Sequence, residues 1–116
     1  MLDLINKYEA IIKDYKVLHF SQEKDLFRFV AEIMFIDDSK LVIRDYRFLS
    51  KERKYVYHWQ NKNNKLIIRW DNAKHWKNIK TYPHHKHIER NTDILESYET
   101  SLNTVLNYIV KIINQR

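Results

Sequence analysis

The sequence has no cysteine and no glycine, and its single proline is Pro83. Without cysteine, the chain has no disulfide framework, no thiolate metal ligand and no thiol nucleophile. Without glycine, it lacks the glycine-rich loops that hold phosphates in P-loop and dinucleotide-binding proteins. Its turns must therefore use asparagine and aspartate, which also tolerate a positive φ angle.

Long apolar runs are missing as well. No stretch approaches the ~20 apolar residues that a membrane-spanning helix requires. Residues 1–7 mix acidic and basic side chains and lack the apolar segment of a secretory signal. These absences predict a cytoplasmic protein with no membrane partner. The 116 residues suit a single domain over residues 1–116, with 44% hydrophobic residues to form its core.

Positive charge is what the sequence has in excess. Its 21 lysines and arginines outnumber the 15 acidic residues and give a formal net charge of +6. Cations that bind phosphates release condensed counterions, so this charge favours a polyanionic partner such as nucleic acid. A basic surface that serves only solubility is the alternative.

Alternating apolar and polar residues predict a sheet. Five runs have the period-two pattern of strands: residues 15–20, 26–36, 41–48, 55–60 and 66–73. Apolar residues at helical spacing predict a helix over residues 2–12 and another after the N-cap candidates Thr100 and Ser101. Short hairpins favour an antiparallel meander. The predicted fold is therefore α+β: a single antiparallel sheet of about five strands, with N- and C-terminal helices packed on one face.

The segment from residue 55 to residue 87 contains all three tryptophans and five of the six histidines. Asn63 and Asn64 fit a two-residue type I′ turn, since asparagine accepts a positive φ at both positions. That register gives an apolar face for the core, consisting of Tyr57, Trp59, Ile68 and Trp70. The opposite, polar face holds His58, Gln60, Arg69 and Asp71, and His58 faces Arg69.

A histidine-rich coil follows and contains His84, His85 and His87, which could return near the polar face. Paired imidazoles can act as general base and general acid near neutral pH. An arginine is suited to stabilise a negatively charged phosphate transition state. RNA supplies its own nucleophile, the 2′-hydroxyl, so such a site requires no serine, cysteine or metal.

Other interpretations of the same residues stay open. The His58–Arg69 pair also fits a solvated sheet face. His75 and the three histidines of the coil offer enough imidazole nitrogens for zinc or nickel. Neither a His-Glu-x-x-His motif nor a paired carboxylate cluster is present, so we expect no metal and no cofactor.

Three ordered motifs resemble the TumE-like toxin family of type II toxin–antitoxin systems. They are Tyr55-x-Tyr57-His58-Trp59-Gln60, Leu66-Ile67-Ile68-Arg69-Trp70-Asp71-Asn72-Ala73 and Pro83-His84-His85-Lys86-His87. The resemblance extends from about Phe27 to His87. Where the family pattern has a proline and a second histidine, this chain has Lys74 and Trp76 around His75. The resemblance implies a toxin that acts on RNA and is encoded beside a helix-turn-helix antitoxin.

The leading hypothesis is a toxin that cleaves RNA without a metal. His58 would share the acid and base roles with His84, His85 or His87. Arg69 would stabilise the transition-state phosphate, and Asp71 would orient Arg69 or an imidazole. Seven lysines would bind the RNA backbone: Lys54, Lys62, Lys65, Lys74, Lys77, Lys80 and Lys86. The alternatives are a non-catalytic single-stranded nucleic-acid-binding module and a metal-dependent hydrolase, and the oligomeric state, a homodimer included, stays open.

Overall fold

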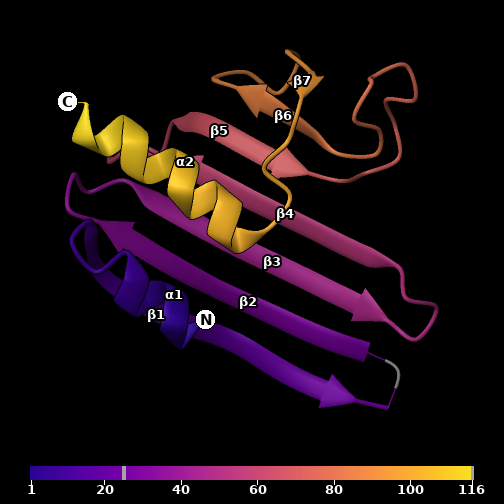
Figure 1. The fold of residues 1–116 in the computed structure, drawn as a ribbon, viewed down its shortest axis with the longest axis horizontal. Coiled ribbons are helices and arrows are strands. Elements are labelled where there is room, and N and C mark those ends of the chain that lie inside the picture. Colours follow the sequence, from indigo (N-terminus) through magenta and orange to yellow (C-terminus); the bar gives the residue numbers. More distant parts are fainter. Residues whose placement is uncertain (25, 116) are drawn as a thin grey trace.

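The computed structural model describes residues 1–24 and 26–115 of the chain. They form one antiparallel sheet, in which seven strands follow one another in chain order, and two helices (Figure 1). The strands are β1 (Ile12–Glu23), β2 (Leu26–Phe35), β3 (Lys40–Phe48), β4 (Arg53–Gln60), β5 (Leu66–Asp71), β6 (His85–Ile88) and β7 (Leu95–Glu96). The helices are α1 (Leu2–Lys7) and α2 (Leu102–Asn114). The α+β class and the antiparallel meander are confirmed.

The predicted count of about five strands is too low, because two strands follow β5 in the described chain. β6 alternates His85 and His87 with Lys86 and Ile88, so it lacks the apolar alternation that identifies a strand. β7 has only two residues. The histidine-rich segment that we expected as coil is therefore partly a strand, hydrogen-bonded to β5.

The first helix is also shorter than predicted. It ends at Lys7, and Ile12 already begins β1. Tyr8 and Ile11, which extended the helical spacing, are still buried, but they lie in the turn between α1 and β1. Spacing alone could not separate these cases, because a compact turn also returns every third or fourth side chain to the core.

Three successive hairpins close with three-residue loops, although the chain has no glycine. The last loop residue is left-handed in each: Asp38, Lys51 and Asn64 have φ angles of 67°, 67° and 63°. The type I′ turn predicted at Asn63–Asn64 is wrong, because only Asn64 has a positive φ. The expected pairing of His58 with Arg69 is nevertheless present, since the register shift falls between Trp59 and Gln60.

The core lies between the sheet and the two helices. Tyr57, Trp59 and Trp70 are at most 1% exposed, as predicted from their shared face. The Tyr8 hydroxyl donates to Asn103 Oδ1 over 2.9 Å, which joins the end of α1 to α2 on one face of the sheet. Ser101 caps α2 in a capping box with Thr104. This packing leaves the other face of the sheet without a helix among the described residues.

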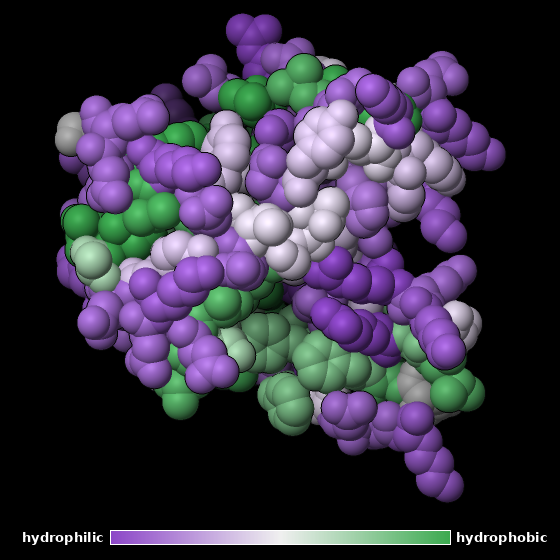
Figure 2. Space-filling view, viewed as in Figure 1, coloured by the Kyte–Doolittle hydropathy of each residue, from purple (hydrophilic) through white to green (hydrophobic). Residues whose placement is uncertain are grey.

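The longer described helix, α2, has 13 residues and does not reach the length that crosses a bilayer. On the helix-bearing side, hydrophilic side chains predominate, and apolar surface is gathered in patches, one of them over β1 and β2 (Figure 2).

Candidate functional site

Two adjacent rows of side chains cross the sheet face that the helices do not cover. His58 on β4, Arg69 on β5 and His87 on β6 are direct cross-strand partners and form one row. Val56, Asp71 and His85 form the neighbouring row on the same strands. Because side chains alternate between the faces of a sheet, these rows project away from the core residues Tyr57 and Trp70.

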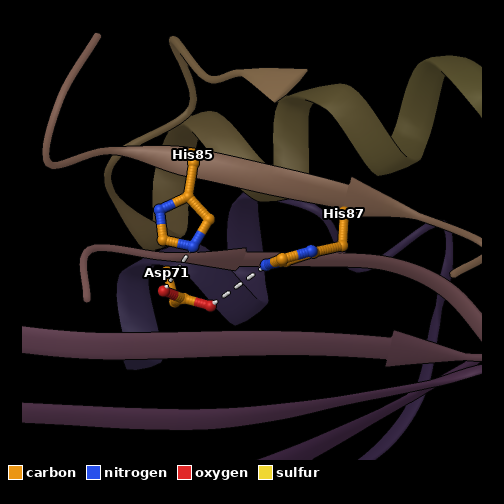
Figure 3. Close-up of side chains that lie close together, drawn as sticks. All are labelled: Asp71, His85 and His87. Atoms are coloured by element: carbon orange, nitrogen blue, oxygen red, sulfur yellow. Dashed lines mark ion pairs between the residues drawn. The ribbon is translucent and has the colours of Figure 1, made fainter. Parts of the chain in front are cut away.

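The Asp71 carboxylate is the centre of this arrangement (Figure 3). Its Oδ1 lies 2.9 Å from His85 Nε2, and its Oδ2 lies 3.9 Å from His87 Nε2 and 3.4 Å from Arg69 Nε. The backbone amide of Ala73 donates to Oδ1 over 3.0 Å. The Asp71 carboxylate is only 7% exposed, and burying its negative charge costs free energy. The guanidinium of Arg69 offsets much of this cost, because it contacts the same carboxylate.

Polar contacts hold the His85 ring at both of its nitrogens. Nδ1 lies 3.0 Å from the Pro83 carbonyl, and Nε2 faces Asp71 Oδ1. Both neighbours are acceptors, so a doubly protonated ring satisfies both contacts. A ring protonated only at Nδ1 would instead turn the Nε2 lone pair toward the carboxylate, a geometry that suits a bridging cation.

Asp71, His85 and His87 are also the described residues that could hold a metal. Each offers one ligand atom, and these three atoms lie within 4.8 Å of one another. Two imidazoles and a carboxylate form a donor set that zinc and other transition metals accept. The sequence suggested His75 and His84 as further nitrogen ligands, but neither belongs to this cluster.

His58 lies beside the cluster in a setting of its own. It lines a cavity of about 260 Å³ together with Val42, Arg44, Val56 and Arg69. Burial lowers the pKa of His58 below its ordinary value, and the positive charges of Arg69 and Arg44 lower it further. The imidazole is therefore neutral near pH 7 and able to accept a proton.

A second cavity adjoins the first. It has a volume of about 360 Å³, and its lining includes Asp71, Trp76, His85 and His87. Val56 and Arg69 line both cavities, so the guanidinium lies between them. Because the two cavities share these residues, they form one depression along β4 and β5.

His87 forms part of this second cavity and has an unusual environment. Burial and the neighbouring His85 lower its pKa, while Asp71 and the backbone of Asn91 act in the opposite direction. Its Nδ1 is buried, and none of the described residues meets it in good hydrogen-bond geometry. The ring is thus held less tightly than that of His85.

His84 is not brought into the cluster. Its Nδ1 lies 2.8 Å from the Tyr55 hydroxyl, and the two rings stack with centroids 5.8 Å apart. Burial and the charge of Arg53 lower the pKa of His84. Because His84 and His85 are adjacent in an extended segment, their side chains point to opposite sides of the sheet.

Six of the seven predicted RNA-binding lysines are exposed, and Lys86 is not. Its ammonium pairs with Glu99 at 2.9 Å on the helix-bearing face, where it also lies 5.0 Å from the centre of the Tyr108 ring. Lys86 therefore holds α2 and the segment before it against the sheet, and nothing in this position favours the predicted contact with RNA. Lys54 lines the second cavity. Lys74 is exposed in the loop between β5 and β6, and its ammonium lies 3.6 Å from the Glu52 carboxylate.

The other exposed lysines lie in two places. Lys77 and Lys80 are in the loop between β5 and β6. Lys62 and Lys65 are in the β4–β5 hairpin loop, at the opposite end of β5 from Asp71. Six strand residues at ~3.3 Å each put Lys65 about 20 Å from Asp71. These two lysines can contact only RNA that extends beyond the cavities.

Sequence reasoning missed Arg44 and Trp76, although both line the depression. Alternation in residues 41–48 already separates Arg44 from the buried Leu41 and Ile43. That signal became informative only once β3 was paired with β4, which brings Arg44 opposite Val56. The exposure of Trp76 had no signal in the sequence beyond its position in a polar loop.

Fold and site together define a small basic α+β protein with a histidine- and arginine-bearing sheet face. The family model described as Toxin TumE matches residues 1–116, so the chain belongs to the TumE toxin family. The resemblance seen between Phe27 and His87 is thereby confirmed and covers the whole sequence. Membership implies an antitoxin partner. Comparisons with curated proteins and with solved structures found no match.

Proposed function

We propose that this toxin is a metal-independent endoribonuclease and that the sheet face around Arg69 is its active site. The observation that carries the proposal is the row of His58, Arg69 and His87 on three neighbouring strands. Strands lie ~4.8 Å apart, so the two histidine backbones are about 10 Å apart, with the guanidinium between them. One phosphodiester can be reached from both sides in this arrangement.

In the proposed reaction, neutral His58 removes the proton of the 2′-hydroxyl, and the 2′-oxygen attacks the adjacent phosphorus. Arg69, assisted by Arg44, stabilises the charge that develops on the phosphate oxygens. The bond from phosphorus to the 5′-oxygen breaks, and that oxygen receives a proton from His87. The products are a 2′,3′-cyclic phosphate and a 5′-hydroxyl end.

Asp71 and His85 have positioning roles in this scheme. Asp71 contacts Arg69 and lies beside His87, and His85 anchors the other carboxylate oxygen. The negative charges of Asp71 and of a bound phosphate both favour the protonated form of His87, which counteracts its burial. Lys54, Lys74, Lys77 and Lys80 are the cations available to the RNA backbone near the cavities.

A metal-dependent hydrolase is the second candidate function. The specific observation in its favour is the buried donor set of Asp71, His85 and His87. A bound metal would activate a water molecule for attack on a phosphate. The two candidates predict different products, because an attacking water leaves no cyclic phosphate.

The test is incubation of untagged protein with a defined RNA in the presence of EDTA. We expect cleavage with cyclic phosphate ends by the wild type and a strong loss of cleavage in both His58→Ala and His85→Ala. His19→Ala is the matched control, since His19 is exposed on β1. Cleavage that EDTA abolishes and zinc restores would select the metal-dependent candidate. Salt-sensitive binding with intact RNA would select the non-catalytic module.

We further propose that the antitoxin is a helix-turn-helix protein and that β1 is available to a partner. β1 is an edge strand of 12 residues, and Val17, Leu18 and Phe20 on it are 50–61% exposed. Exposed edges and apolar side chains commonly receive a partner strand or a second copy. Mass measurement of the toxin alone and of the co-expressed pair distinguishes a homodimer from an antitoxin complex.

A further inference from the structure

Trp76 differs from the other two tryptophans in a way that the fold does not require. Trp59 and Trp70 are fully buried, whereas Trp76 is 41% exposed. Among the described residues, no aromatic ring stacks on the Trp76 indole. A large part of this residue stays open to solvent, so core packing alone does not explain its position.

The position of Trp76 is what points to a ligand. Its side chain lines the same 360 Å³ cavity as Arg69, Asp71 and His87. That volume is at the small end of the ~300–1,000 Å³ typical of ligand pockets and suits one nucleotide. His75 and Lys54 complete the polar surroundings.

We propose that Trp76 is a stacking platform for one unpaired base of single-stranded RNA, next to the phosphate at Arg69. The proposal rests on the function proposed above and specifies its substrate. An indole face accepts any base, and only an unpaired base exposes a face for stacking. Arg69 borders both cavities, so a phosphate bound there has the stacked base on one side and His58 on the other.

This arrangement excludes a continuous duplex as the preferred substrate. Bases within a duplex are stacked on one another, so an aromatic side chain can stack on one of them only if that base first leaves its neighbour. Stacking also tolerates all four bases, so this subsite selects for single-strandedness and not for sequence. The basic side chains around the cavity would supply the salt-dependent part of the affinity.

The experiment measures binding of a 2′-O-methyl hexanucleotide, which cannot provide the attacking hydroxyl, to full-length protein. Tryptophan emission reports the contact, because the two buried tryptophans are shielded from the oligonucleotide. We expect quenching in the wild type and in Phe20→Leu, an exposed aromatic control on β1. Trp76→Leu should lose the quenching and bind about 5- to 150-fold more weakly, the equivalent of ~1–3 kcal/mol for one stacked base.

A series of hexanucleotides with one abasic site each makes the test specific. At one position of the oligonucleotide, an abasic site should weaken binding to the wild type by the same factor as the Trp76→Leu substitution does. The same abasic site should cause no further loss of affinity in the Trp76→Leu variant. Equal affinity of the wild type and Trp76→Leu, measured by a labelled oligonucleotide, would overturn the proposal. Losses that add at every position would overturn it as well.

The outcome is separable from that of the ribonuclease proposal. Trp76-dependent binding together with intact natural RNA would keep the base subsite and reject the catalysis. Cleavage of natural RNA with identical affinities for the wild type and Trp76→Leu would reject the subsite and keep the ribonuclease. Thermal melting of Trp76→Leu close to that of the wild type confirms that the variant is folded.

Discussion

His58 lies directly opposite Arg69 across β4 and β5, on the sheet face that neither described helix covers. The pair combines an imidazole whose pKa is lowered with the guanidinium that contributes to lowering it. A base and a phosphate-binding group are thus fixed on adjacent rigid strands. The proposed chemistry follows from this geometry, and its base, its charge environment and its independence of metal can be tested separately.

Replacing His58 with asparagine should remove the general base and leave the fold intact. We expect kcat/KM for RNA cleavage to fall by about 10²–10⁴-fold, the usual contribution of a positioned base. Initial rates on a fluorogenic oligonucleotide provide the measurement. The matched variant is His19→Asn, and a loss in His58→Asn no larger than in this control would contradict the assignment.

The acid limb of the pH–rate profile should lie below pH ~6.5, the ordinary value for imidazole. His58 must be neutral to act as a base, and its pKa is lowered, so kcat/KM falls only as the pH drops through that lowered value. Arg44→Gln removes one positive charge, which raises the pKa of His58 and moves the limb to higher pH. Arg28→Gln removes a positive charge on β2 and should leave the acid limb of the profile at the same pH. An equal shift of the acid limb in both variants would show that Arg44 has no specific effect on the pKa of His58.

Extensive dialysis against EDTA should leave both activity and stability unchanged. The reason is that the proposed reaction draws its base, acid and charge stabilisation from side chains alone. Elemental analysis of protein purified without a tag checks the metal content. One equivalent of zinc in the wild type that disappears in Asp71→Asn would instead assign a metal to the carboxylate and its two histidines.

Lys86→Ala should act on stability and not on RNA binding. Lys86 and Glu99 are 15% and 17% exposed, and the Trp70 indole also donates to Glu99. Losing the lysine leaves a largely buried carboxylate short of a partner, so urea unfolding should show a loss of about 1–3 kcal/mol. Lys77→Ala, at an exposed position, should stay within about 0.5 kcal/mol of the wild type.

For RNA binding, the variant to compare with Lys86→Ala is Lys54→Ala. Removing one lysine that binds a phosphate of single-stranded RNA reduces the slope of log affinity against log salt by about 0.7. Lys54→Ala should show this reduction and Lys86→Ala should not, because only Lys54 lines the second cavity. A reduced slope in Lys86→Ala with unchanged stability would restore Lys86 to the RNA-binding surface.

Lys51→Gly should stabilise the protein. Lys51 has a φ of 67°, and this left-handed conformation is unfavourable for a residue with a Cβ atom. Glycine adopts it without that strain, although it loses more conformational entropy on folding, and the relief of strain is the larger effect. We expect a gain of about 0.5–1 kcal/mol in the free energy of unfolding. Lys51→Ala keeps the Cβ atom and should give no gain, so equal effects of both substitutions would exclude this explanation.

Much of the site's β4–β5 half could be predicted because burial determines the register there. Tyr57, Trp59 and Trp70 must share one face, which excludes a one-residue slip, and the position of the turn between the two strands then sets His58 opposite Arg69. The wrong turn type at Asn63–Asn64 did no damage, since a three-residue loop with a bulge near Gln60 restores the same pairing. Apolar burial outweighs turn preference in such a hairpin.

The β6 half could not be predicted in the same way. His85 and His87 alternate with Lys86, so no apolar pattern marks the strand or its faces. His84 and His85 are indistinguishable in a coil, yet a strand directs them to opposite sides. The sequence therefore grouped three histidines, of which two lie at Asp71 and one at Tyr55.

The sequence by itself determined the α+β class, the order of the first five strands and the core face, because these follow from local periodicity and the burial of large apolar side chains. Only the tertiary structure decided that β6 returns along the edge of β5, bringing two imidazoles to Asp71 and turning Lys86 toward Glu99. That pairing depends on the path of the loop between β5 and β6 and on backbone hydrogen bonds along the edge of β5. Neither leaves a pattern in the side chains from which it could be predicted.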